Sequence, residues 1–169
     1  AWARRVVQDP NTGVFSAQVW LPEAYKWEHS APKGSDKPLM IYECHIGMSS
    51  EEKRVSTYNE FREHVLPRIA ELGYNAIQLM AIQEHPYYGS FGYHVSNFYA
   101  PSSRFGTPEE LKALVDVAHG LGLKVIMDLV HSHAVKNEVE GLARYDGTRT
   151  LFFHEGGRGE HPAWDSLCF

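Results

Sequence analysis

The sequence predicts an α/β fold with a parallel sheet, because three apolar, strand-like segments alternate with two capped helical segments. The strand-like segments are residues 39–47, 76–82 and 124–130. Right-handed βαβ units give this order of elements. Residue patterning leaves a doubly wound sheet and a barrel both open. No Gly-x-Gly-x-x-Gly follows a strand, which weakens a dinucleotide-binding interpretation.

Two further segments precede the α/β part. Residues 1–21 alternate in hydrophobicity around a turn signal at residues 9–13, as expected for the last hairpin of a β-sandwich domain. Residues 22–38 are polar and contain three prolines, which predicts a linker. We therefore expect domain boundaries at 1–21, 22–38 and 39–169.

The two predicted helices have clear start and stop signals. Thr57 and Glu60 have the spacing of a capping box, Gly73 follows the last apolar position, and Pro67 should kink or split this helix. The second helix begins with Thr107 and Pro108 and ends at Gly122. A long aromatic loop is expected from about residue 83 to 106.

Composition excludes several classes of partner. The net charge is -5 with scattered Lys and Arg, so no nucleic-acid surface is expected. The most apolar stretch, residues 121–130, is too short to span a membrane. Cys44 and Cys168 form no metal-type pair and are expected to be free thiols in a reducing cytoplasm. Aromatic residues make up 12% of the chain, and sugar rings stack on such side chains.

Polar side chains lie within and directly after the third predicted strand. Asp128 needs a hydrogen-bonding partner if it is buried there. His131 and His133 are two residues apart, as in some metal sites of barrel hydrolases. Two imidazoles do not complete a tetrahedral zinc site and no other ligands are evident. We therefore expect no metal and no cofactor.

Several ordered motifs resemble those of the α-amylase family of glycoside hydrolases and transferases. Asp-Leu-Val-His-Ser-His at 128–133 resembles its first signature region, and Gly-Tyr-His at 92–94 resembles the loop after its second barrel strand. Residues 41–48 resemble the first barrel strand of branching enzymes, and residues 79–93 and 161–169 are most similar to branching enzymes of the eukaryotic type. The resemblance runs from about residue 14 to the last residue. It implies the first three strands of a (β/α)8 barrel.

The resemblance also implies a substrate site. Tyr93 matches a tyrosine that stacks under the glucose ring at the cleavage subsite, and His133 matches a histidine that bonds hydroxyls of that sugar. Asp128 matches an aspartate that braces the site. Ser132 replaces the asparagine that binds calcium in amylases, so no calcium site is expected. The nucleophilic Asp and the acid/base Glu of the family are expected after Phe169, which leaves no catalytic residue within this chain.

The implied activity is 1,4-alpha-glucan branching, with glycogen or starch as the partner, in the cytoplasm or, in a photosynthetic eukaryote, a plastid. The 169 residues alone are expected to be inactive. Three alternatives stay open: an α-glucan hydrolase such as amylase, pullulanase or isoamylase, a non-catalytic glucan-binding fragment, and a His-x-His metallohydrolase. Oligomeric state and transferred chain length are not encoded in these motifs.

Overall fold

The computed structural model describes residues 2–34 and 37–169. It divides into two compact units, which are described separately. Unit 1 contains residues 1–20, 81–103 and 129–169, and unit 2 contains residues 21–80 and 104–128. The expected domain boundaries at residues 21 and 38 stay a prediction.

Unit 2 is built around a three-stranded parallel sheet. Its strands are β3 (Ile41–Cys44), β4 (Ala76–Leu79) and β7 (Lys124–Met127), in the order β3-β4-β7. Tyr42 pairs with Ile77, and Ile77 with Val125. The expected parallel order is thus confirmed, but each strand is shorter than predicted. The third ends at Met127 and not at Val130, although the Asp128 N–H still donates to the Leu79 carbonyl at 3.0 Å.

The first helical segment of unit 2 is irregular. After the short helix η1 (Ile46–Met48), it consists of α1 (Tyr58–Glu60), a π-helical turn η2 (Phe61–Val65) and α2 (Leu66–Glu71). The Thr57–Glu60 capping box is present. Pro67 lies at the start of α2, directly after the π turn. This confirms the expected split, because proline removes one N–H from the helical ladder and a wider turn accommodates the gap.

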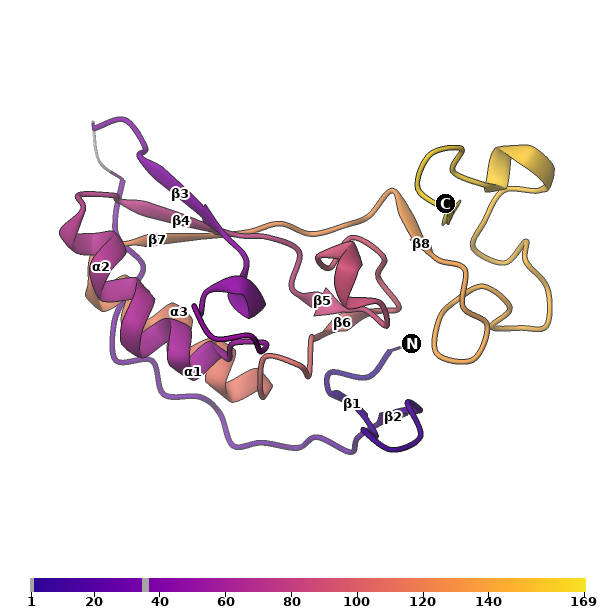
Figure 1. The fold of residues 1–169 in the computed structure, drawn as a ribbon, viewed down its shortest axis with the longest axis horizontal. Helices are drawn as coiled ribbons and strands as arrows, with labels where there is room; N and C mark the ends of the chain where they lie inside the picture. Colours follow the sequence, from indigo (N-terminus) through magenta and orange to yellow (C-terminus); the bar gives the residue numbers. More distant parts are fainter. Residues whose placement is uncertain (1, 35–36) are drawn as a thin grey trace. The chain divides into compact units, whose positions relative to one another are not determined.

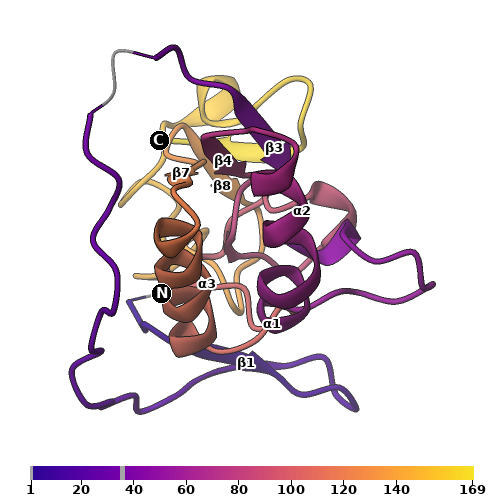
Figure 2. The same cartoon turned by 90° about the vertical axis from the view of Figure 1, so that its left-hand side faces the viewer.

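The second helix, α3 (Pro108–Gly120), is regular and also begins with a capping box, formed by Thr107 and Glu110. Leu114 and Ala118 on its inner face are fully buried. Both helical segments lie on the same face of the sheet (Figures 1 and 2). Sequential strand order with right-handed crossovers produces this arrangement.

The polar segment before β3 is fastened to α3 by one buried carboxylate. Asp116 accepts hydrogen bonds from the backbone N–H groups of Glu28 (3.0 Å) and His29 (2.8 Å) and from the Tyr25 hydroxyl (3.2 Å). These bonds, led by the one from Glu28, hold the pKa of Asp116 below its usual value. The predicted linker is therefore held in place over residues 25–29.

Unit 1 consists of three antiparallel strand pairs. β1 (Val6–Gln8) pairs with β2 (Phe15–Ala17), which confirms the expected hairpin. β5 (Gln83–Glu84) pairs with β6 (Asn97–Pro101), and β8 (His133–Val135) pairs with β9 (Ser166–Cys168). Two short 3₁₀ helices, η3 (Tyr88–Ser90) and η4 (Gly156–Gly159), lie in the connections. The region expected to be a loop therefore contains the β5–β6 pair.

Neither cysteine is in a disulfide. Cys44 is buried, and burial raises the pKa of its thiol to about 12, so this sulfur is chemically inert at neutral pH. Within the described ranges, no helix is long and apolar enough to cross a membrane.

Candidate functional site

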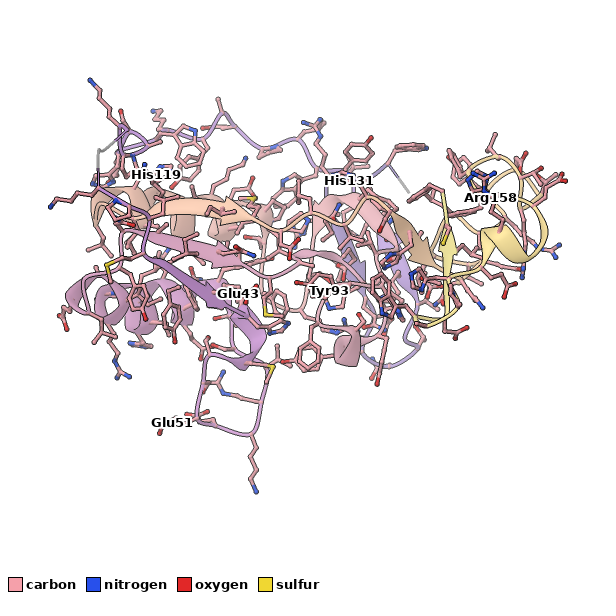
Figure 3. The ribbon with its side chains drawn as sticks, turned by 90° about the horizontal axis from the view of Figure 1, so that it is seen from above. Glu43, Glu51, Tyr93, His119, His131 and Arg158 are labelled. Atoms are coloured by element: carbon pink, nitrogen blue, oxygen red, sulfur yellow. The ribbon has the colours of Figure 1, made fainter. Side chains whose placement is uncertain are left out.

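Tyr93 lies in a tight loop of unit 1 between η3 and β6 (Figure 3). Its backbone N–H donates to the Ser90 carbonyl at 3.0 Å. Gly92 has a φ of +91°, and a Cβ there would overlap the carbonyl oxygen of Ala81. Only glycine allows so close a backbone approach in this conformation. The Tyr93 ring, half-buried, packs against a small core of Ala81, Val95 and Val130.

The structure brings His133 directly to Tyr93. His133 begins β8, is 4% exposed, and its Nε2 lies 2.8 Å from the Tyr93 carbonyl oxygen. The Val135 N–H donates to the Val95 carbonyl at 3.0 Å. Two hydrogen bonds therefore join the segment at Tyr93–Val95 to strand β8. The sequence-predicted pair Tyr93 and His133 therefore belongs to one local structure.

Both ring nitrogens of His133 are engaged. Nε2 faces a carbonyl oxygen and must carry the proton, which leaves Nδ1 to accept from the Ser132 hydroxyl at 3.0 Å. Ser132 is exposed. A sugar hydroxyl that bonds to His133 would therefore take the place of Ser132 on Nδ1, as a donor.

Burial lowers the pKa of His133. The hydrogen bond to Tyr93 acts in the opposite direction, and the neighbouring His94 and His161 lower the pKa further. At neutral pH the ring is therefore uncharged, which matches the tautomer required by its two bonds.

A stability difference with pH follows from this shift. His133 has a folded-state pKa below the unfolded value of about 6.5, so its contribution to stability is fully present above that pH and is lost as the pH falls through the lower folded-state pKa. The thermal midpoint of the full-length protein should fall between pH 7.5 and 5.5, and His133→Gln should flatten this dependence. His154→Gln, at an exposed histidine of the same unit, should leave it unchanged; equal curves for both variants would contradict the assignment.

Three aromatic side chains lie around His133 in a cluster that the sequence alone did not reveal. The rings of His94, His161 and Trp164 have centroids 6.4, 5.9 and 5.2 Å from that of His133. His161 and Trp164 are stacked at 4.0 Å with an interplanar angle of 1°. Their only sequence signal was the similarity of residues 161–169 to branching enzymes, which assigned no role to either ring.

A buried polar side chain, also missed from the sequence, holds the site's backbone. Gln83 is 4% exposed; its Nε2 donates to the Phe98 carbonyl at 3.1 Å and its Oε1 accepts the Val130 N–H at 2.9 Å. The buried Glu84 next to it accepts the Ser103 N–H at 2.8 Å. These bonds fix the segments before and after Tyr93 and the segment that leads to His133.

Asp128 is described with unit 2, directly after β7, and is half-buried. Tyr93 and His133 belong to unit 1. A common site for all three residues therefore stays a prediction.

The two histidines of the His-x-His pair differ in their surroundings. His131 precedes β8 and is exposed (Figure 3), whereas His133 is buried. Across residues 2–34 and 37–169, no group of three or more His, Cys, Asp or Glu side chains is arranged to hold a metal ion.

Comparison with known proteins gives one family. Residues 63–162 match the family described as "Alpha amylase, catalytic domain". Over its full length the chain is 56% identical to a 1,4-alpha-glucan-branching enzyme of Rhizophagus irregularis and 58% identical to the chloroplastic/amyloplastic branching enzyme 2-2 of Arabidopsis thaliana. It spans 25% and 21% of those proteins.

Solved structures agree with this family. A crystal structure provisionally described as an alpha amylase from Salmonella typhimurium has a TM-score of 0.72 at 28% identity, over 98% of this chain and 26% of that one. The crystal structure of a trehalose-6-phosphate hydrolase from Bacillus licheniformis has a TM-score of 0.52 at 29% identity, over 58% of this chain and 18% of that one.

Proposed function

Because the chain belongs to the alpha-amylase catalytic-domain family, we propose that it forms part of a 1,4-alpha-glucan branching enzyme and supplies part of its donor-sugar site. The observation that carries this proposal is identity of 52–58% with branching enzymes along the whole chain. Identity to the amylase-type and trehalose-6-phosphate hydrolase structures is 28–29%. The transferase is thus favoured over the hydrolase.

The reaction follows from the chemistry of retaining glycosidases. One carboxylate attacks the anomeric carbon of an α-1,4 glucan and forms a covalent glycosyl-enzyme, while a second protonates the leaving oxygen. The second group then activates a 6-hydroxyl of another glucan, and an α-1,6 branch forms. We assign neither carboxylate to these 169 residues.

The residues described here act on the donor sugar. The Tyr93 ring offers a flat apolar face to the glucose unit, and the rigid loop around Gly92 holds this face in one orientation. His133 Nδ1 accepts a hydrogen bond from a hydroxyl of the same sugar. We also propose the bracing role for Asp128, the residue directly after β7.

The larger architecture belongs to the same proposal. The β3-β4-β7 sheet, with helices on one face, forms the first three strands of a (β/α)8 barrel over residues 39–169. Residues 1–21 end a β-sandwich domain and 22–38 link the two. We place the enzyme in the cytoplasm, or in a plastid as for the Arabidopsis relative.

The products formed by the full-length protein from amylose test the function. New α-1,6 linkages should appear in proton NMR spectra while the number of reducing ends stays constant, since each cleaved bond is replaced by another. A rise in reducing ends without α-1,6 linkages would indicate a hydrolase. Retention on glycogen without any change in linkage would indicate a binding fragment only.

Tyr93→Ala in the full-length protein should lower turnover on amylose by roughly one to two orders of magnitude. Stacking of a nucleic-acid base on an aromatic side chain is worth about 1–3 kcal/mol, which we take as the scale for a sugar ring, and about 1.4 kcal/mol corresponds to a factor of ten. Tyr93→Phe keeps the ring and should retain most of the activity. Tyr145→Ala, at a half-exposed tyrosine of the same unit, serves as the control. Equal rates for the Tyr93 and Tyr145 alanine variants would remove Tyr93 from the site.

A further inference from the structure

We propose that Trp164, supported by His161, forms a second stacking platform for the α-glucan beside His133. This proposal rests on the proposed function and extends it to a further glucose unit of the same chain. The platform is the face of the Trp164 indole that points away from His161. Its class of ligand is a hexopyranose of an α-1,4 glucan.

Neither neighbouring histidine ring covers the second face of the Trp164 indole. His161 stacks on the first face, with centroids 4.0 Å apart and parallel planes. His133 lies 5.2 Å from Trp164 and 5.9 Å from His161. If His133 lay beyond Trp164, its distance to His161 would approach the sum of the other two separations. His133 is therefore beside the stacked pair, and Trp164 is 54% exposed.

The backbone holds this indole in a closed turn. The His161 N–H donates to the Ser166 carbonyl at 2.8 Å, and the Ala163 N–H donates to Nδ1 of His161 at 3.3 Å. Asp165 adopts a left-handed φ of +47°, which sharpens the turn. The platform is thus part of a local loop with defined hydrogen bonds.

The same turn is tied to the strand that carries His133. β9 pairs with β8, and His133 is the register partner of Cys168. Lys136, just after β8, forms ion pairs with Asp165 at 2.7 Å and Glu160 at 3.2 Å, on both sides of the turn. A half-exposed tryptophan held in place in this way has already lost most of its side-chain freedom, which lowers the entropic cost of binding a ligand.

The chemistry of the surface selects a sugar. An indole face is flat and apolar, while the exposed Ser132 hydroxyl, which is bonded to Nδ1 of His133, can exchange that bond for one to a sugar hydroxyl. His133 also bonds to the Tyr93 backbone carbonyl, so Tyr93 and Trp164 both belong to residues that neighbour the same histidine. We propose that one glucan chain places linked glucose units on both aromatic rings.

Binding of maltohexaose to the full-length protein, measured by calorimetry, tests the platform. Trp164→Ala should weaken the affinity about tenfold and raise the KM for amylose with little change in kcat. Trp164→Phe keeps a stacking ring and should bind within about threefold of the parent protein. Trp27→Ala, at a tryptophan of the other unit with 53% exposure, is the matched control and should bind normally.

Fluorescence provides a second readout that does not depend on the alanine variant being folded. Maltohexaose should quench the tryptophan emission of the parent protein and quench that of Trp164→Phe much less. Unchanged affinity in Trp164→Ala, or equal quenching in Trp164→Phe and the parent, would overturn the platform while branching activity persists. A parent protein that neither binds maltohexaose nor forms α-1,6 linkages would instead refute the proposed function.

Discussion

Gly92→Ala is expected to destabilise the protein by about 3–5 kcal/mol and to abolish most of its activity. Two effects add at this position. A φ of +91° is strained for any residue with a Cβ, and that Cβ would overlap the Ala81 carbonyl oxygen. Backbone atoms cannot rotate away as a flexible side chain can, so the loop that carries Tyr93 must move. Losses of this size are exceptional for one methyl group and mark a close backbone contact.

Gly147→Ala separates the two effects. Gly147 has nearly the same φ, +89°, but no atom lies within 4 Å of its hypothetical Cβ. The Gly147→Ala substitution should lower the free energy of unfolding only by the conformational strain, about 1 kcal/mol. Urea unfolding midpoints of the two variants in the full-length protein provide the comparison. Equal midpoints would show that the approach of Gly92 to Ala81 does not constrain the loop.

The isolated 169-residue chain is expected to form no α-1,6 linkages at all. A retaining mechanism needs two carboxyl groups about 5–5.5 Å apart, and no residue here matches either one. The sugar on Tyr93 would therefore meet no nucleophile. In addition, β3 and β7 each pair with only β4 among the described residues, which leaves two strand edges open to aggregation.

An amylose–iodine assay on the purified chain, with its mass confirmed, checks this expectation. The full-length protein serves as the positive control. Loss of the iodine colour together with new α-1,6 linkages from the isolated chain would show that it contains a complete catalytic pair.

The sequence predicts the elements of unit 2 well because their signals are local. Capping boxes at Thr57 and Thr107 begin both helical segments, and the three apolar segments that alternate with them contain the strands. Strand ends are less well predicted. Met127 and not Val130 ends β7, because hydrophobicity continues beyond the last parallel pairing.

Unit 1 is predicted less well because its pairs are short and distant in sequence. β5 has two residues, and β8 pairs with β9 across 30 intervening residues that contain no regular strand signal. Tyr93 and His133 were found through family motifs, whereas Gln83 and Trp164 act through contacts that periodicity does not encode. A glutamine in an apolar run gives no indication of which carbonyl and N–H it will bridge.

The central claim is that the loop carrying Tyr93 and the strand carrying His133 bind the donor glucose of an α-glucan. The most direct measurement is the structure of the full-length protein with bound maltohexaose. We predict one glucose ring stacked on Tyr93 at about 4 Å, with a hydroxyl about 3 Å from Nδ1 of His133. Well-ordered maltohexaose bound elsewhere, with the Tyr93 ring in contact only with protein, would contradict this account.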